Sequence, residues 1–259
     1  MTTPKLNPHV RHQEKIRIVI DLVSKFGFAS PANITLAVGT KRQGTPTQMV
    51  NAGILNSRSM SGLIVLGKGV TAILGLTKRE ALAAEAKPVD IWKVTSNRAA
   101  HTLIAQSETV LQMQGKIVNN PNLEFEKFEV EPQQLGETRR PDVVWYFFDK
   151  KNNQRFKINV EIELSAKDGR DLDQFFTKLL FANVITFVVF EEERLLRRYV
   201  EHAKTYHAAG SMPIWKKTNG AWWKLESQEP IPAKRWNDLY FKIANNSKLQ
   251  PLSDLMNKP

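Results

Sequence analysis

The sequence predicts a mixed α/β protein, α+β when the whole chain is considered, built from two parts. Short segments with helical spacing come first, and a pair of short apolar strands follows them before residue 75. After Arg139 the pattern changes to strand, helix and strand, the succession that builds an α/β core. An alanine-rich helical link reaches Pro88 between the two patterns. We therefore expect one domain over residues 1–90 and another over residues 91–259.

The chain has 259 residues, no cysteine, and 37 Lys and Arg residues against 26 Asp and Glu residues, which gives a formal net charge of +11. A chain of this length buries a substantial core as one large domain or two small ones. The lack of cysteine excludes a disulfide framework, a cysteine-bound zinc ion, an iron–sulfur cluster and thiol catalysis. The positive charge favours a polyanionic partner, most simply nucleic acid, although many ribosomal and membrane-surface proteins are equally basic.

The apolar stretches of the chain are short. One of the longest, Val184–Phe190, is far below the roughly 20 residues that a membrane-spanning helix needs. The first residues, MTTPKLNPHVRHQEK, are polar and lack the apolar segment of an export signal. We therefore expect a cytoplasmic protein without membrane insertion.

The N-terminal part contains clear signals for the starts and ends of helices. Gln13–Phe26 has apolar residues at helical spacing. Ser30-Pro31 and Thr45-Pro46 each combine an N-cap residue with proline at the first helical position, and they open further short helices. After a polar stretch, the apolar segments Leu63–Leu66 and Val70–Leu74 predict a β-hairpin.

Helices followed by a β-hairpin in this order are typical of a winged helix, which predicts DNA binding. In that fold the third helix enters the major groove and the hairpin lies over the backbone. A helical subdomain with polar caps and no DNA partner is the alternative, because many such units share the same spacing. The residues expected to contact base edges or phosphates are Thr45, Thr47, Gln48 and Asn51, and those expected to contact phosphates beside the helix are Lys41, Arg42 and Arg58.

The strands of the second part are marked by β-branched and aromatic residues. Val143–Phe148 and Phe156–Leu164 have this composition, and the polar residues Asp149–Asn153 between them predict a turn. Asp168–Phe181 has helical spacing, and Val184–Phe190 is apolar as a buried strand would be.

Acidic residues occur at defined places on the first two of these strands. Asp142 begins one strand, and Glu161 and Glu163 lie near the end of the next, where residues two apart point to the same face. If the strands pair through the predicted turn, Asp142 lies opposite Ile162 or, after a shift of one residue, opposite one of the glutamates. Carboxylates gathered on one face repel each other unless a divalent cation lies between them, and Mg²⁺ or Mn²⁺ suits such oxygen ligands.

A cation held by Asp142, Glu161 and Glu163 serves phosphodiester cleavage, because it polarises a phosphoryl oxygen and activates water. Lys167 is the candidate for the positive charge that stabilises the reacting phosphate. Gln174 and Lys178 lie four residues apart on one face of the following helix and are candidates to hold the DNA backbone. A solvated strand face is the alternative, because burying the apolar residues of the strand already forces both glutamates to one side.

A tract rich in tryptophan and lysine lies near the C-terminal end. Trp215-Lys216-Lys217 and Trp222-Trp223-Lys224 combine aromatic rings with cations, as single-strand-binding grooves do. Tryptophans of compact α/β proteins more often pack in the core, so both roles remain open.

Two motifs in this chain resemble known families. Pro141-Asp142 followed by Glu161 and Glu163 resembles the PD-(D/E)XK nuclease superfamily, with Glu163 at the position usually held by lysine, as in some restriction endonucleases. More narrowly, the winged-helix order, a helix containing His101, and the segments RRPD and VEIELSAK resemble the MobC-type relaxases of mobilisable plasmids and related replication–relaxation proteins. This resemblance spans roughly residues 15 to 190.

The resemblance implies a PD-(D/E)XK restriction-endonuclease-like domain after the winged helix. It also implies a metal-dependent endonuclease that binds double-stranded DNA at a plasmid transfer origin and nicks one strand. Other relaxosome or coupling proteins would then be further partners. The five histidines contain no His-x-His pair, so the histidine-cluster and tyrosine mechanism of most relaxases is not supported.

Rival functions remain open at this point. A non-catalytic DNA-binding protein, acting as a relaxosome accessory protein or a repressor, would use the same winged helix. A restriction-type endonuclease would use the same carboxylates but cut both strands. Nicking or double-strand cleavage depends on the oligomeric state, because one site per monomer nicks and a symmetric pair of sites cuts both strands.

Overall fold

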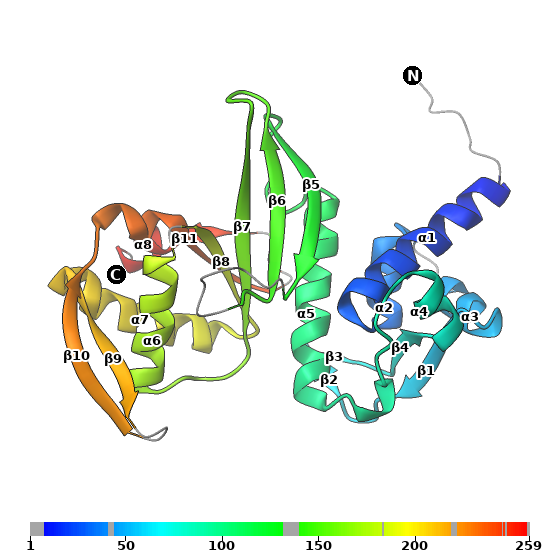
Figure 1. The fold of residues 1–259 in the computed structure, drawn as a ribbon, viewed down its shortest axis with the longest axis horizontal. Helices are drawn as coiled ribbons and strands as arrows, with labels where there is room; N and C mark the ends of the chain where they lie inside the picture. The colour runs from blue at the N-terminus through cyan, green and yellow to red at the C-terminus, as the bar shows by residue number, and fades with distance from the viewer. Residues whose placement is uncertain are drawn as a thin grey trace. The chain divides into compact units, whose positions relative to one another are not determined.

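Figure 1 shows the computed structural model of the protein, which describes residues 8–40, 44–131, 140–182, 184–218, 222–244, 246 and 248–257. The chain divides into two compact units, Met1–Val110 and Leu111–Pro259. This division lies inside helix α5 (Ser96–Met113), whereas the sequence analysis placed the boundary at residue 90. No helix within the described ranges combines the length and the apolar character needed to cross a membrane.

The first unit combines short helices with antiparallel strands. The helices before the strands are α1 (Pro8–Phe26), α2 (Pro31–Ala37) and α3 (Gly44–Asn51). Strand β1 (Leu55–Ser59) pairs with β4 (Ala72–Leu76), and the tip of this hairpin contains β2 (Ile64–Val65) and β3 (Lys68–Gly69). Helix α4 (Lys78–Ala83), the 3-10 helix η1 (Ile91–Lys93) and α5 follow. The predicted order of helices and hairpin is confirmed, but α3 begins at Gly44, so Thr45 lies inside the helix and is not its predicted N-cap.

The contacts around α2 explain where the helices begin and end. The Ser30 hydroxyl accepts a hydrogen bond from the Asn33 backbone N–H at 3.1 Å, and Pro31 is the first residue of α2. Gly27 ends α1 with a φ of 85°, and a Cβ atom there would lie 2.6 Å from Cγ2 of Val89. The helices and the hairpin enclose a hydrophobic core that includes Val19, Val23, Ala29, Ile34, Met49, Leu55 and Leu74.

The first strand of the hairpin differs from the prediction. Residues 56–59 are predicted to be a polar connection, but they belong to β1, whose pairing with β4 runs from Leu55↔Leu76 to Ser59↔Ala72. Leu55 is buried, and the other residues of β1 are exposed or half-buried. Exposed polar residues still supply backbone N–H and C=O groups to the ladder, so this strand forms without an apolar pattern in the sequence.

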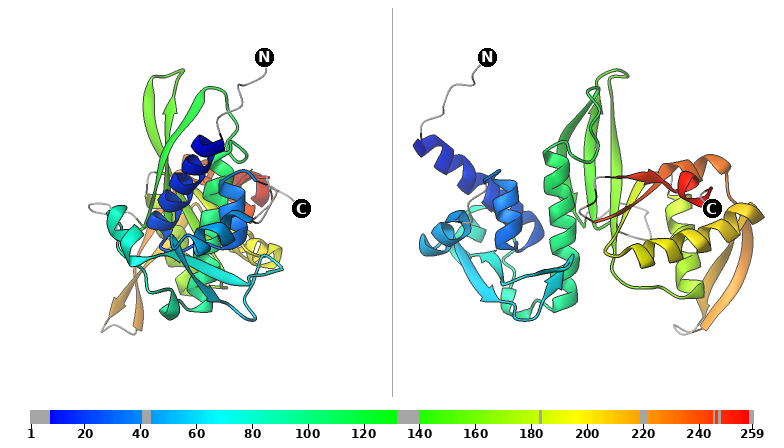
Figure 2. Two further views of the ribbon diagram at one scale, coloured as in Figure 1. Left: turned by 90° about the vertical axis from the view of Figure 1, so that its right-hand side faces the viewer. Right: turned by 180° about the vertical axis from the view of Figure 1, so that it is seen from behind.

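In the described part of the second unit, six strands form one mixed sheet in the order β12-β11-β8-β7-β6-β5. The strands are β5 (Leu123–Val130), β6 (Val143–Asp149), β7 (Gln154–Glu163), β8 (Ile185–Phe190), β11 (Leu239–Ile243) and β12 (Gln250–Pro251). Strands β7, β8 and β11 run parallel, and the remaining neighbours pair antiparallel. Figure 2 shows the sheet from two further directions. The predicted strand–helix–strand core is β7, α6 (Gly169–Phe181) and β8, and it is confirmed.

Helices cover one face of this sheet. They are α6, α7 (Glu193–Ala209), the 3-10 helix η2 (Ala233–Asp238) and α8 (Leu252–Met256). Val188 and Phe190 of β8 and Phe241 of β11 belong to the core between sheet and helices. The core residues from the helices include Leu172, Phe175, Phe176, Leu179, Leu196, Tyr199 and Trp236. Strands β9 (Ser211–Thr218) and β10 (Trp222–Pro230) form a separate antiparallel ribbon.

Strand β5 is not predicted from the sequence. Its sequence, LEFEKFEV, contains glutamates where a buried strand would have apolar residues. The strand lies at the edge of the sheet, where charged residues discourage pairing with another chain. Its pairing with β6 also shifts register between Phe125 and Lys127, which interrupts the two-residue alternation by which strands are detected.

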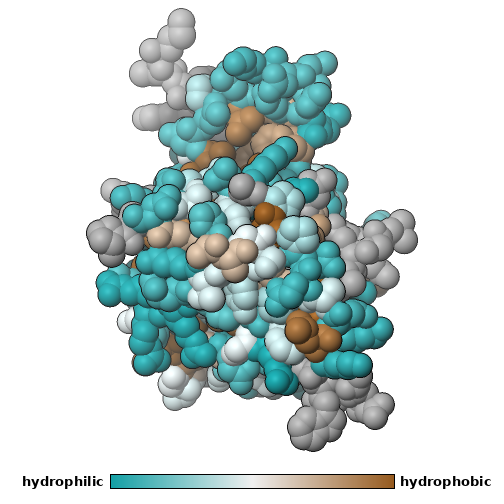
Figure 3. All heavy atoms as spheres, turned by 90° about the vertical axis from the view of Figure 1, so that its left-hand side faces the viewer, coloured by the Kyte–Doolittle hydropathy of each residue, from teal (hydrophilic) through white to brown (hydrophobic). Residues whose placement is uncertain are grey.

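The surface in the view of Figure 3 is mostly hydrophilic. Hydrophobic side chains appear there in small groups separated by polar ones. Scattered exposed apolar residues of this kind are ordinary, so this view gives no indication of a broad apolar binding surface.

Candidate active site and DNA interface

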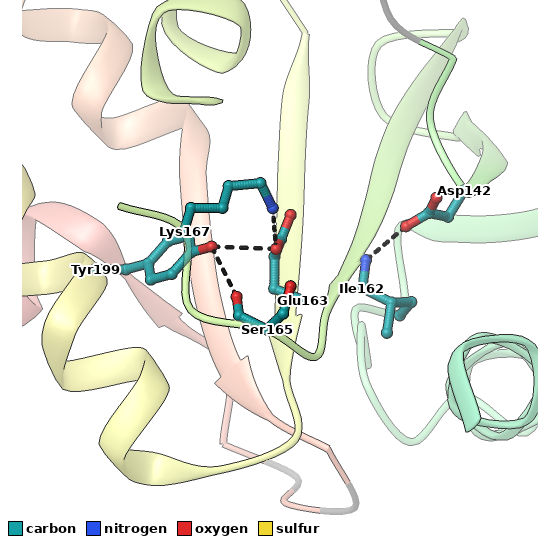
Figure 4. Close-up of polar contacts among 6 residues, drawn as sticks. All are labelled: Asp142, Ile162, Glu163, Ser165, Lys167 and Tyr199. Carbon is teal, nitrogen blue, oxygen red and sulfur yellow. Dashed lines mark hydrogen bonds and ion pairs between the residues drawn. The ribbon is translucent and has the colours of Figure 1, made fainter. Parts of the chain in front are cut away.

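The pairing of β6 with β7 brings Asp142 to the two glutamates. The register runs from Asp149↔Gln154 to Val143↔Val160, and its continuation by one residue sets Asp142 opposite Glu161. Oδ2 of Asp142 accepts a hydrogen bond from the Ile162 backbone N–H at 2.7 Å (Figure 4). Of the alternatives left by the sequence, the shift of one residue is therefore the observed one.

Both glutamates are buried on the face of the sheet that the helices cover. Glu161 and Glu163 are each 3% exposed. They pair in register with Val188 and Phe190 of β8, which lie in the core beneath α6 and α7. Because a buried carboxylate is costly unless it has close polar partners, the partners of these residues decide what they can do.

The partners of Glu163 are a lysine and a tyrosine. Its Oε2 atom forms an ion pair with Nζ of Lys167 and accepts a hydrogen bond from the Tyr199 hydroxyl at 3.1 Å (Figure 4). The same hydroxyl lies 3.4 Å from the carbonyl oxygen of Ser165. Nζ of Lys167 also lies 5.0 Å from the centre of the Phe175 ring. Glu163 thus contacts a cation supplied by the chain itself.

The three carboxylates do not gather as the sequence analysis expected. Among the described residues, no group of three or more His, Cys, Asp or Glu side chains is arranged to hold a metal ion. Asp142 approaches β7 from the β6 side and bonds to Ile162, whereas the Glu163 carboxylate turns to Lys167 and Tyr199. The remaining candidates at this place are Asp142 and Glu161.

A buried amide oxygen lies on the same face of β7. Asn159 is two residues before Glu161 and is 6% exposed. Its Oδ1 atom has no hydrogen-bond partner within the described part of the chain. Since buried acceptors are nearly always paired, this oxygen is a candidate to contact an ion or a water molecule.

Helix α3 presents most of its predicted DNA-binding residues to solvent. Pro46 and Met49 are buried, and Thr47, Gln48 and Asn51 are exposed, while Thr45 is half-buried. Lys41 and Arg42 lie outside the described residues.

Arg58 has contacts inside the first unit. Its Nη1 atom donates to the carbonyl oxygens of Ile91 at 2.6 Å and Val94 at 2.9 Å. The prediction that Arg58 contacts phosphate is not what the structure shows for this nitrogen. In the structure this nitrogen of the guanidinium links β1 to the segment around η1, which is a structural contact.

Helix α6 links its polar residues to the ribbon of β9 and β10. Gln174, predicted to hold the DNA backbone, donates from Nε2 to the carbonyl oxygen of Trp215 at 2.5 Å. The Trp215 indole N–H donates to Asp173 at 2.8 Å, and the guanidinium of Arg170 lies 4.9 Å from its ring centre. Trp215 is therefore engaged within the fold, while Lys178 is exposed on α6.

Asp173, which the sequence does not single out, is a buried carboxylate with 4% of its surface exposed. Its Oδ1 atom lies 2.7 Å from Nε2 of His202 and accepts a hydrogen bond from the Tyr206 hydroxyl at 2.6 Å. Its other oxygen accepts the Trp215 indole N–H. The sequence feature that could have identified Asp173 is its position three residues before Phe176, which places a carboxylate on the apolar face of the helix.

Two tyrosines have raised pKa values. Burial, followed by the hydrogen bond to Glu129 at 2.9 Å, raises the pKa of Tyr146 to about 12. Burial, followed by the hydrogen bond to Asp173, also raises the pKa of Tyr206 above its ordinary value. A raised pKa keeps these hydroxyls protonated at neutral pH and makes them weak nucleophiles.

Known proteins give no independent indication of the role of these residues. Comparison of the chain with models of protein families, with curated proteins and with solved structures finds no match. The roles proposed below therefore depend on the contacts described above and on the motifs in the sequence.

Proposed function

We propose that this protein binds DNA and nicks one strand at a plasmid transfer origin with a divalent cation, as MobC-type relaxases are expected to do. In this proposal the first unit is a winged helix and the second is a PD-(D/E)XK nuclease-like domain. The observation that supports it best is the register of β6 and β7, whose continuation sets Asp142 opposite Glu161. A carboxylate at the start of one strand and another near the end of the next form the acidic part of the PD…ExE motif.

Asp142 and Glu161 would hold the Mg²⁺ or Mn²⁺ ion in this proposal. Their carboxylate oxygens are the hard ligands that both ions prefer, and the orphaned Oδ1 of Asn159 adds a further oxygen on the same face of β7. When bound, the ion polarises a phosphodiester oxygen and lowers the pKa of water. The Ile162 backbone N–H orients the Asp142 carboxylate, and burial of Glu161 excludes water that would screen its charge.

The other groups of the site have distinct tasks. The Lys167 ammonium stabilises the negative charge that develops on the phosphate during cleavage. Water is the nucleophile in this proposal, and the raised pKa values of Tyr146 and Tyr206 disfavour the phenolate forms of these two alternatives. The exposed side chains of Thr47, Gln48 and Asn51 contact DNA. The negative charge of DNA is complementary to the protein's net charge of +11.

A non-catalytic DNA-binding protein, acting as a relaxosome accessory protein or a repressor, is the second candidate. A specific observation favours it: the described residues contain no arranged group of three metal-ligating side chains. A restriction-type endonuclease that cuts both strands would need a symmetric pair of sites.

Supercoiled plasmid DNA separates these functions. The protein is incubated with Mg²⁺ or Mn²⁺ and with plasmids that contain or lack the transfer origin. Relaxed circles support the nickase, linear DNA supports the restriction-type enzyme, and binding without cleavage supports the accessory protein. Asp142→Asn removes a proposed ligand, and Glu226→Gln, which changes an exposed carboxylate on β10, is the matched control. Cleavage that persists in Asp142→Asn would exclude the proposed site.

A further inference from the structure

The ion pair of Glu163 with Lys167 suggests a role for Glu163 different from that of Asp142 and Glu161. We propose that Glu163 positions the Lys167 ammonium at the active site and is not a ligand of the cation. This inference rests on the proposed function, because it assigns a task within the same site. It means that the lysine of the PD-(D/E)XK motif, missing at position 163, is supplied from position 167.

The contacts of Glu163 support a fixed position for the ammonium. Lys167 and Tyr199 both donate to the same oxygen, Oε2, and they approach Glu163 from one side in Figure 4. Tyr199 is fully buried, and its ring meets those of Phe175 and Phe190 at centroid distances of 5.2 Å and 4.9 Å. A rigid aromatic cluster therefore holds the hydroxyl that holds the carboxylate.

The lysine is confined from a second direction. The Lys167 side chain is 26% exposed, and its ammonium lies 5.0 Å from the centre of the Phe175 ring. A lysine held in this way loses side-chain conformational entropy. The ion pair with the buried Glu163 carboxylate and the contact with the Phe175 ring compensate for that loss. The ammonium is thus oriented before any substrate arrives, as preorganised charge stabilisation requires.

The charge balance argues against a cation on Glu163. This carboxylate is 3% exposed and already has a positive partner, so the ion pair neutralises it inside the protein. A divalent cation bound to the same oxygens would stand beside the ammonium and repel it. The Asp142 carboxylate is bonded to the Ile162 N–H and lies apart from the Glu163–Lys167 pair in Figure 4.

The position of the ammonium is appropriate for the reaction. Glu161 and Glu163 share one face of β7 and lie two residues apart, a separation of about 6.6 Å along a strand. A phosphate contacted by a cation on Asp142 and Glu161 would therefore lie close to the ammonium held by Glu163.

Binding of Mn²⁺ separates a ligand from a positioning residue. Thermal unfolding of the full chain is followed during a Mn²⁺ titration, because an ion that binds the folded state raises the melting temperature. We expect Asp142→Asn and Glu161→Gln to abolish this increase, and Glu163→Gln to keep it at the same Mn²⁺ concentration. Loss of the increase in a folded Glu163→Gln variant, with the wild type responding, would overturn this inference alone.

Nicking kinetics supply the second measurement. Glu163→Gln and Lys167→Ala should each lower kcat by about 100-fold with little change in KM for DNA. Tyr199→Phe keeps the buried ring and removes one donor to Glu163, so a smaller loss of kcat with an intact Mn²⁺ response is expected; it also replaces Glu163→Gln if that variant does not fold.

A charge exchange tests where the ammonium is needed. The double variant Glu163→Lys with Lys167→Glu restores the ion pair and returns lysine to the usual position of the motif. We expect the double variant to nick DNA about tenfold faster than Glu163→Lys or Lys167→Glu alone. A folded double variant that responds to Mn²⁺ without this recovery would contradict the inference. Absence of both Mn²⁺ response and nicking in the wild type would instead remove the proposed function and this inference together.

Discussion

The carboxylate of Asp142 accepts a hydrogen bond from the backbone N–H of Ile162 at 2.7 Å, beyond the last paired position of β6 and β7, Val143↔Val160. A side chain thus continues the contact between the strands after the backbone ladder ends. The same hydrogen bond orients the carboxylate that is proposed to hold a cation, so structure and function depend on one contact.

Asp142→Ala should therefore lower the free energy of unfolding, and Asp142→Asn should lower it less. Alanine leaves the Ile162 N–H without this acceptor, which costs about 1–2 kcal/mol because the bond is made by a charged group. Asparagine retains an amide oxygen that accepts the same bond. Urea unfolding of the two variants measures the difference, and equal stabilities would show that the bond contributes nothing to folding.

Asn159→Leu should change stability and ion binding in opposite directions. Without a cation, removing the unpaired buried Oδ1 should stabilise the protein by about 1 kcal/mol or more, since an unsatisfied buried acceptor is costly. With Mn²⁺, the rise in melting temperature should be smaller than in the wild type, if Oδ1 contacts the ion. An unchanged rise would remove Asn159 from the cation site and leave Asp142 and Glu161.

Substitutions on α3 should affect the sequence preference of DNA binding, whereas substitutions of Lys41 and Arg42 should affect its overall strength. Gln48→Ala and Asn51→Ala should each reduce the preference for specific over random DNA by about 1–3 kcal/mol, the value of a good base contact. Lys41→Ala and Arg42→Ala should weaken binding to all sequences and reduce its salt dependence. Fluorescence anisotropy at several salt concentrations distinguishes the two effects, and identical behaviour of all four would exclude α3 as a reading helix.

Arg58→Ala serves as the comparison within the same unit. It should lower the melting temperature of the protein, because the carbonyl groups of Ile91 and Val94 lose a donor. The salt dependence of DNA binding should stay the same. A reduced salt dependence would instead support the phosphate contact expected from the sequence.

The hydroxyl of Tyr146 should make the protein less stable at alkaline pH. Its pKa is raised from 10.0 to about 12 by burial and by Glu129, so the folded state binds the proton more tightly than the unfolded state does. This stabilisation is fully present below pH 10 and is lost as the pH rises through about 12. Unfolding free energies of wild type and Tyr146→Phe, measured across this range, should converge as the pH rises; parallel curves would contradict the assignment.

Elements with a strong local sequence signal are predicted correctly, whereas strands that form only by pairing with another strand are not predicted. The Ser30-Pro31 cap and the apolar run before Phe190 act within a few residues, so their helix and strand are visible in the sequence. Strand β1 exists through its pairing with β4, and β5 through its pairing with β6. Strand β1 has no periodic apolar pattern, and the alternation of β5 is interrupted by the register shift between Phe125 and Lys127.

The candidate site also has features that the sequence predicts and features that it does not. The alternation that sets Glu161 and Glu163 on one face is a property of any strand, and the position of Asp142 follows from a short turn, so both are predictable. The sequence does not reveal that Lys167 turns back onto Glu163, because its position depends on Phe175 and on Tyr199 from α7. For the same reason the sequence suggests three equivalent carboxylates where the structure has two different environments.

If water is the nucleophile, no covalent link between protein and DNA should form during nicking. Tyr146 and Tyr206 have raised pKa values and donate to Glu129 and Asp173, which keeps both hydroxyls protonated and occupied. Tyr146→Phe should therefore leave the rate of nicking close to that of the wild type. Denaturing gels of reactions with end-labelled DNA measure any adduct directly, and Asp142→Ala serves as the inactive reference. Protein left on the DNA end, together with loss of nicking in one tyrosine variant, would contradict hydrolysis by water while leaving the nickase itself intact.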